Sequence, residues 1–121
     1  MTLRFAEVVL IRIRFHERPG WKVRPAVVLF DAGDDDFVAA PITSRPRLSS
    51  LDLALVDWRE AGLNAASTVR AHKPVVSSKA DILRRLGVLP EGDSERLRAV
   101  LRKVFCERTA ESQSVQTSRV R

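Results

Sequence analysis

Two polar groups stand at the ends of neighbouring apolar runs in this sequence. Arg24 leads into the apolar run 26–30, and Thr43 and Ser44 end the next run, 37–42. If these runs pair as an antiparallel hairpin, the start of the first lies beside the end of the second. A guanidinium and a hydroxyl group then share one pocket, a combination that suits the binding of a phosphate. Because side chains alternate along a strand, we expect Thr43 and Ser44 to face opposite sides, so only one of them faces the pocket, with a backbone hydrogen bond as the alternative for either hydroxyl.

Arg70 and His72 form a second candidate pair. They lie two positions apart at the predicted strand 67–71, so both side chains point to the same face. A histidine can donate or accept a proton near neutral pH, which makes His72 a candidate for proton transfer. The alternative is a histidine that only packs or faces solvent. Lys73, the next residue, adds positive charge to the same region.

Two predicted loops carry further cations and an aromatic ring. In the first, Arg18, Trp21 and Lys22 can bind phosphates and stack on bases, although Trp21 can equally cover the edge of the core. In the second, Arg45 lies just beyond Thr43. If the anionic partner is a nucleic acid, we expect the geometry of these two loops to decide which bases are selected.

The charge balance of the chain favours an anionic partner. Its 121 residues include 21 Lys and Arg against 15 Asp and Glu, giving a net charge of +6 and a pI near 10.7. The first 25 residues hold six cations and two anions, so most of the excess lies in the first predicted hairpin. The single cysteine, Cys106, excludes an internal disulfide and fits a reducing compartment, so we expect a cytoplasmic protein. No apolar run approaches the roughly 20 residues of a membrane span.

The apolar pattern predicts a mostly β domain with one helix, an α+β fold. We expect a single domain over residues 1–106 and a disordered tail over 107–121, which is rich in Ser, Thr, Gln and Glu. A helix beginning near Pro90 presents an apolar stripe to the sheet through Leu97, Val100, Leu101, Val104 and Phe105. We expect helical turns at 57–61 and 78–83, and strands at 7–15, 24–31, 37–42, 51–56, 67–71 and 86–89.

Motifs for a metal or a cofactor are absent from the sequence. The run Asp34-Asp35-Asp36 lacks the alternating ligands and the following glutamate of a calcium loop, and turns commonly collect Asp. There is no glycine-rich phosphate loop. We therefore expect a site that works without a metal ion or a cofactor.

Six short segments follow one another in a distinctive order and spacing: 7–10, 23–29, 40–44, 57–63, 67–70 and 85–87. Together they resemble the PemK/MazF family of toxin endoribonucleases, over nearly the whole folded part of the chain. The resemblance implies a small, strongly curved, SH3-like antiparallel barrel with a C-terminal helix, working as a homodimer. It also implies cleavage of single-stranded RNA without a metal ion, and inhibition by a cognate antitoxin.

The resemblance also implies roles for individual residues. Arg24 matches the arginine that active members place at the scissile phosphate, and Thr43 matches the hydroxyl residue beside it. Arg70 matches an arginine that some members pair with a carboxylate two positions later, where this chain has His72. His16 lies in the loop that the family often closes over substrate or antitoxin.

The chemistry expected of such a site is modest. RNA carries its own nucleophile, the 2′-hydroxyl, so the protein must hold it in line with the phosphorus and stabilise negative charge. The first product is then a 2′,3′-cyclic phosphate. A guanidinium stays charged, so we expect Arg24 to stabilise the transition state rather than to act as a base. Two alternatives are a related fold that poisons a protein such as DNA gyrase without cutting RNA, and a degenerate member that only binds an antitoxin, which His72 keeps open.

Overall fold

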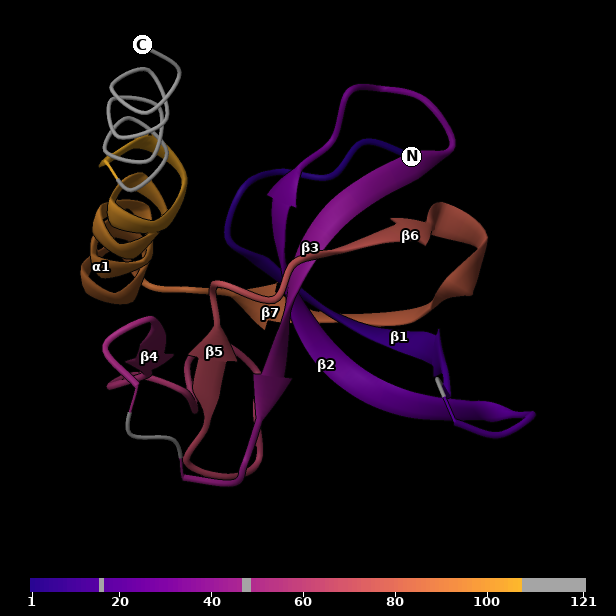
Figure 1. The fold of residues 1–121 in the computed structure, drawn as a ribbon, viewed down its shortest axis with the longest axis horizontal. Coiled ribbons are helices and arrows are strands. Elements are labelled where there is room, and N and C mark those ends of the chain that lie inside the picture. The colour runs from indigo at the N-terminus through magenta and orange to yellow at the C-terminus, as the bar shows by residue number, and fades with distance from the viewer. Residues whose placement is uncertain (16, 47–48, 108–121) are drawn as a thin grey trace, which may run out of the picture.

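The described chain is a curved antiparallel sheet followed by one helix, as the sequence predicts (Figure 1). The computed structural model describes residues 1–15, 17–46 and 49–107. His16 and residues 108–121 of the expected tail lie outside the described residues. The elements are β1 (Glu7–Arg14), β2 (Trp21–Phe30), β3 (Asp36–Thr43), β4 (Asp52–Ala54), β5 (Thr68–Arg70), β6 (Val75–Ser78), the 3-10 turn η1 (Lys79–Asp81), β7 (Ile82–Val88), α1 (Glu91–Arg102) and the π-helical segment η2 (Lys103–Glu107).

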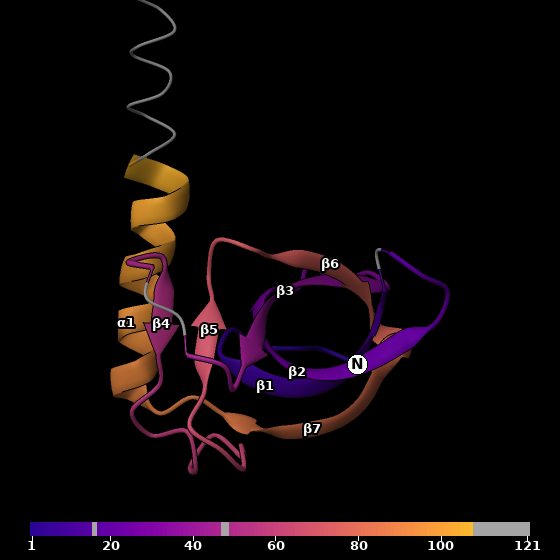
Figure 2. The same ribbon diagram turned by 60° about the horizontal axis from the view of Figure 1, so that its bottom comes forward.

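The strands form one strongly curved sheet. Its order is β4-β5-β3-β2-β1-β7, and β6 also pairs with β3. Figure 2 shows β1, β2, β3, β6 and β7 curling around a common centre, with β4, β5 and α1 to one side. β6 leads through η1 into β7, but in the described part of the chain no ladder joins these two strands. The sheet is therefore strongly curved but does not close into a complete barrel.

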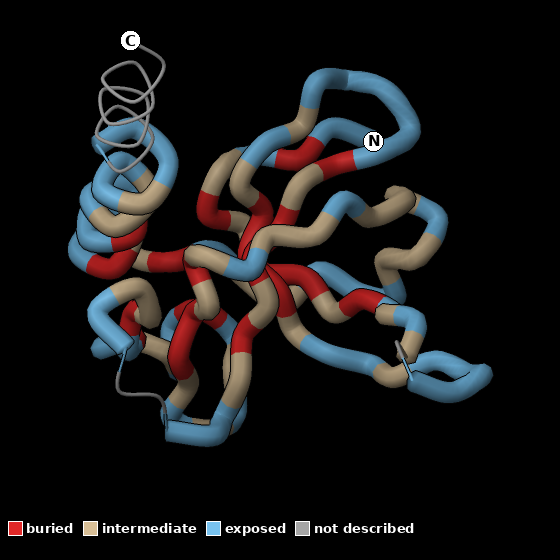
Figure 3. Tube along the Cα trace, viewed as in Figure 1, coloured by how far each residue is buried: buried red, intermediate tan, exposed pale blue. Residues whose placement is uncertain are grey.

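The hairpin of β1 and β2 extends beyond the core. Its ladder runs from the pair Val8 and Val27 to the pair Arg14 and Trp21. Gly20, with φ of +115°, closes the turn, and its carbonyl accepts a hydrogen bond from Phe15 N at 3.1 Å. The far end of this hairpin is exposed, whereas the buried residues gather where the strands cross (Figure 3).

The alternation of side chains gives the sheet two apolar faces. The face inside the curl buries one cluster, which includes Val9, Ile11, Ala26, Val28, Phe37 and Ala39. The outer face is covered by α1, β4 and β5 and buries a second cluster, which includes Val8, Val27, Ile42, Leu53, Val69 and Leu97. Residues that are neighbours in sequence, such as Val8 and Val9, therefore belong to different clusters.

The helix α1 is tied to the sheet at two points. Leu97 is fully buried, and Val100 and Leu101 pack against the same cluster, as the predicted stripe requires. Phe105 departs from the prediction, because it is 46% exposed near the end of η2. The fully buried carboxylate of Asp93 accepts hydrogen bonds from Val56 N at 3.0 Å and Asp57 N at 2.8 Å, which fixes the chain after β4 to the start of α1.

Several predicted boundaries are wrong, each for a physical reason. β2 begins at Trp21 rather than 24, because pairing with β1 extends the strand to the turn. β7 begins at Ile82 rather than 86, for the same reason. β6 was not predicted, since its four residues become a strand only by pairing with β3. The expected helical turn after Asp57 is present as a single hydrogen-bonded turn, in which Ala61 N donates to the carbonyl of Asp57 at 3.3 Å, and it ends at Gly62.

Candidate active site

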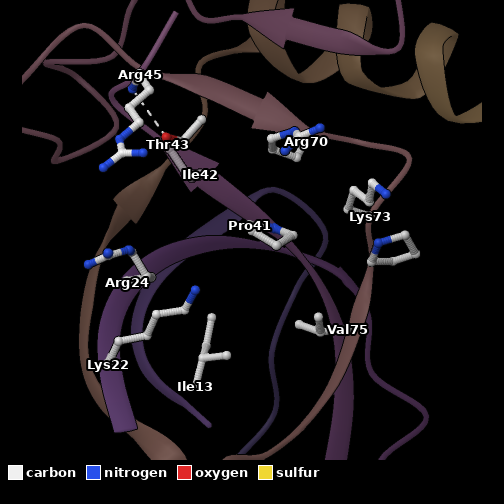
Figure 4. Close-up of a pocket in the computed structure, with 11 residues that line it drawn as sticks. Ile13, Lys22, Arg24, Pro41, Ile42, Thr43, Arg45, Arg70, Lys73 and Val75 are labelled. Carbon is white, nitrogen blue, oxygen red and sulfur yellow. Dashed lines mark hydrogen bonds between the residues drawn. The ribbon is translucent and has the colours of Figure 1, made fainter. Parts of the chain in front are cut away.

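A pocket of about 560 Å³ opens beside the ends of β2 and β3 (Figure 4). Its walls come from β1, β2, β3 and β5 and from the segment that leads into β6. The lining residues are Ile13, Lys22, Arg24, Pro41, Ile42, Thr43, Arg45, Arg70, Lys73, Pro74 and Val75. Five of these eleven residues are Lys or Arg and none is acidic, so the pocket attracts an anion.

The register of β2 and β3 brings Arg24 and Thr43 to this pocket. The ladder ends with the pair Ala26 and Pro41. Arg24 and Thr43 each lie two residues beyond that pair, on the same face of the hairpin. Both line the pocket, so the structure places a guanidinium and a hydroxyl group in the wall of one pocket.

The two groups differ in how they are held. The Arg24 side chain is exposed, and its Nη1 donates a hydrogen bond to the neighbouring carbonyl of Val23 at 3.0 Å. Thr43 Oγ1 accepts a hydrogen bond from Arg45 N at 3.1 Å. This is the backbone bond that the sequence left open as an alternative, but it uses only an acceptor position of the hydroxyl. The hydroxyl hydrogen of Thr43 is thus still able to donate to a phosphate oxygen.

Arg70 belongs to a more rigid wall. It is paired across the β4–β5 ladder with Asp52, and Nε of Arg70 donates to Oδ1 of Asp52 at 3.0 Å. The side chain of Asp52 is 2% exposed and that of Arg70 is 24% exposed. Asp52 was not predicted as a site residue. The sequence shows a carboxylate in one predicted strand and an arginine in another, and only the pairing of those two strands brings them into contact.

His72 lies behind Arg70 rather than at the pocket wall. Its Nε2 is 3.3 Å from Nη2 of Arg70, and its Nδ1 is 3.7 Å from Oδ1 of Asp52. The predicted sharing of one face by Arg70 and His72 is therefore observed. His72 is not among the residues that line the pocket, whereas Lys73 is.

The remaining candidates divide between the pocket and its surroundings. Lys22 and Arg45 line the pocket. Ser44 is exposed and does not line it, as the strand alternation predicts. Arg18 lies over the ring of Phe15, with its Cζ atom 4.2 Å from the ring centroid, beside a separate hollow at the hairpin turn.

Trp21 lies on the opposite face of the hairpin from Lys22. It is 47% exposed, and the guanidinium carbons of Arg12 and Arg14 lie 5.4 Å and 5.1 Å from its ring centroid. The pairs Arg14–Trp21 and Ile13–Lys22 of the ladder explain the separation, because adjacent pairs face opposite sides. Trp21 therefore belongs neither to the pocket nor to the buried core.

Across residues 1–15, 17–46 and 49–107, no three His, Cys, Asp or Glu side chains converge as a metal site requires. Within the same ranges, no helix is both long and apolar enough to cross a membrane.

The fold and the site define a small, mostly antiparallel β protein with a C-terminal helix and a cationic pocket. The family model of the PemK-like, MazF-like toxins of type II toxin-antitoxin systems matches residues 4–105. The chain belongs to this family. No curated protein is similar enough in sequence to match it.

Solved structures with the same fold include three toxins of low sequence identity. The Mycobacterium tuberculosis toxin MazF-mt6 superposes with a TM-score of 0.64 at 22% identity, covering 80% of this chain and 95% of that one. A MazE–MazF structure from Deinococcus radiodurans gives 0.67 at 19% identity, covering 84% and 94%. A mycobacterial endoribonuclease in complex with its cognate antitoxin gives 0.69 at 14% identity, covering 86% and 95%. At these identities the likeness establishes the fold.

Proposed function

We propose that this protein is the toxin of a type II toxin-antitoxin pair and an endoribonuclease that cuts single-stranded RNA at selected sequences. The observation that carries the proposal is the pocket in which Arg24, Thr43 and Arg70 meet, with five cations and no acid in its lining. A phosphodiester is the anion that matches this set, because guanidinium groups bind phosphate oxygens in pairs and a hydroxyl donates to a third.

In the proposed reaction the substrate supplies the nucleophile. The 2′-oxygen forms a bond to phosphorus while the bond from phosphorus to the 5′-oxygen breaks, which leaves a 2′,3′-cyclic phosphate and a 5′-hydroxyl. Water takes the proton from the 2′-hydroxyl and returns one to the 5′-oxygen. Arg24 and Arg70 stabilise the charge that develops on the phosphoryl oxygens, and Thr43 donates a hydrogen bond to one of them. The charge that a metal ion would neutralise is thus met by arginines.

The cations around these three residues hold the strand on either side of the cut. Lys22, Arg45 and Lys73 line the same pocket and bind the neighbouring phosphates. Arg18, Trp21 and Ser44 lie outside it and contact nucleotides farther along the strand, where an exposed ring can stack on a base. For His16, which lies between Arg14 and Trp21 in the sequence, we propose the same role.

Two protein partners accompany the proposed activity. Similar folds have been solved as MazE–MazF and as an endoribonuclease with its cognate antitoxin, which supports a cognate antitoxin for this chain as well. An acidic antitoxin segment would be attracted by the net charge of +6. We also propose a homodimer, and action in the cytoplasm, where messenger RNA is available.

The test is incubation of the purified protein with a mixed-sequence single-stranded RNA in excess EDTA. We expect cleavage at a short recurring sequence, lost in Arg24→Ala and retained in Arg84→Ala, a matched removal of an exposed arginine on β7. RNA left intact by the folded wild-type protein would refute the nuclease and favour a poison or an antitoxin-binding protein without catalysis. Cleavage that EDTA abolishes would refute the metal-independent route.

A further inference from the structure

Behind the pocket, three polar side chains from β4, from β5 and from the residue pair after it form one cluster: Asp52, Arg70 and His72. We infer that Asp52 and His72 are positioning residues that hold the Arg70 guanidinium at the pocket wall, and that His72 acts as a hydrogen-bond acceptor and transfers no proton. The inference rests on the proposed ribonuclease function. It concerns how this chain, with a histidine at position 72, prepares Arg70 for a phosphate.

Asp52 is buried in a way that only its partners explain. A carboxylate that is 2% exposed costs free energy unless it is paired and hydrogen-bonded. The ladder places Asp52 directly opposite Arg70, and Nε of Arg70 lies 3.0 Å from Oδ1. The next pair of the ladder, Leu53 with Val69, is buried and holds both backbones. Arg70 is therefore fixed at its root by a charge-assisted bond.

His72 fixes a second nitrogen of the same guanidinium. Arginine can only donate, so the contact of 3.3 Å between Nη2 of Arg70 and Nε2 of His72 requires Nε2 to be the acceptor. The ring is then neutral, with its proton on Nδ1. Among the described residues, Nδ1 is buried without a hydrogen-bond partner and lies 3.7 Å from Oδ1 of Asp52. A proton on Nε2 would point at the guanidinium, so this geometry opposes proton transfer through that atom.

The cluster leaves one part of Arg70 to the pocket. Nε is bound to Asp52 and Nη2 to His72, so rotation of the guanidinium plane is restrained from both sides. Arg70 lines the pocket, and Nη1 is the nitrogen that these two contacts do not use. A guanidinium held before the substrate arrives loses little entropy when it binds a phosphate, and its effect falls mainly on the transition state.

The Asp52 half of the inference is tested by a double-mutant cycle of Asp52→Asn and Arg70→Gln, with kcat and KM measured on one cleavable RNA. We expect Asp52→Asn to lower kcat about 10- to 100-fold, because Arg70 is no longer held in place, and to leave KM unchanged or lower, because a negative charge is removed. In the Arg70→Gln background the same change should cost less than about twofold. Asp81→Asn, which breaks the Arg12–Asp81 pair at 3.1 Å, is the matched control and should leave kcat unchanged.

Equal losses from Asp52→Asn in both backgrounds would overturn the inference, as would a rise in KM with kcat unchanged. If Asp52→Asn does not fold, Asp52→Glu enters the same cycle, where the retained carboxylate should preserve more activity than Asp52→Ala. A wild-type protein that does not cleave RNA refutes the proposed function, and the inference with it. A wild-type protein that cleaves, with Asp52→Asn equally active, refutes the inference alone.

The His72 half is tested by replacing the ring with groups that differ in their ability to accept. Gln places an amide oxygen near the position of Nε2, so we expect His72→Gln to keep activity within about threefold of wild type, while His72→Leu loses about tenfold. The pH profile of kcat/KM should have the same shape in wild type and in His72→Gln. Arg70 and Asp52, the charged groups that contact His72, are unchanged in both proteins. Loss of one limb of that profile in His72→Gln would show proton transfer and overturn this half.

Discussion

The two arginines of the pocket are held in opposite ways. Arg24 comes from an exposed hairpin, and its hydrogen bond goes to the carbonyl of Val23 beside it. Arg70 comes from the short strand β5, which pairs with β4, and Asp52 and His72 contact its guanidinium. The wall that carries Arg24 is exposed, whereas the guanidinium of Arg70 is held by two side chains. Positive charge alone therefore does not describe this site, because the two arginines differ in the contacts that hold their side chains.

β4 and β5, which carry Asp52 and Arg70, share a core cluster with α1. The largest predicted effect is the loss of stability that follows from a cavity in this cluster. Leu97 is fully buried in the cluster that contains Val69 of β5 and Leu53 of β4. We expect Leu97→Ala to lower the free energy of unfolding by about 2–5 kcal/mol, because it leaves a cavity in that cluster. Chemical denaturation measures the loss. Leu83→Ala, at a half-exposed position on β7, is the control and should change stability by less than about 1 kcal/mol.

For the wall that carries Arg24 we expect a large effect on catalysis and a small effect on stability. Arg24→Ala should reduce kcat/KM about 100- to 1,000-fold, because a donor to the developing phosphoryl charge is lost. Its melting temperature should stay within about 2 °C of wild type, because the side chain is exposed. A large loss of stability in Arg24→Ala would remove the contrast between the walls.

A smaller effect should follow from a cation that only binds the flanking strand. Lys22→Ala should weaken the binding of a non-cleavable single-stranded oligonucleotide and reduce the slope of log K against log salt by about 0.7, the contribution of one neutralised phosphate. Arg84→Ala should leave the slope unchanged. A salt slope that is the same in Lys22→Ala and wild type would show that the strand does not cross this side of the pocket.

The smallest predicted effect is on the pH dependence of stability and concerns Asp31, which follows β2 at the end away from the pocket. Hydrogen bonds from Leu3 N and Gly33 N, together with Lys79, lower the pKa of Asp31 from 3.8 to about 2. A lowered pKa in the folded state means that the stabilisation is present above pH 3.8 and is lost as the pH falls towards about 2. Asp31→Asn should therefore flatten the loss of stability over that interval. Asp35→Asn, on the same turn, should retain the wild-type slope.

The sequence predicted those parts of the site that depend on local pairing. Arg24 and Thr43 meet because one short turn joins their strands, and alternation along that hairpin could be read directly. Asp52 could not be found in this way, since its partner Arg70 is 18 residues away and the register of β4 and β5 joins them. Trp21 and Lys22 show the converse, because the earlier start of β2 sends these neighbours to opposite faces.

The end groups of the cleavage products show directly whether the 2′-hydroxyl of the RNA is the nucleophile. A single-stranded RNA that contains a cleaved sequence should be incubated with the protein in EDTA, beside the same oligonucleotide with one 2′-deoxy nucleotide at the cut. We expect a 2′,3′-cyclic phosphate and a 5′-hydroxyl from the first, and binding without cleavage of the second. Cleavage of the 2′-deoxy substrate, or fragments that carry a 5′-phosphate, would contradict it.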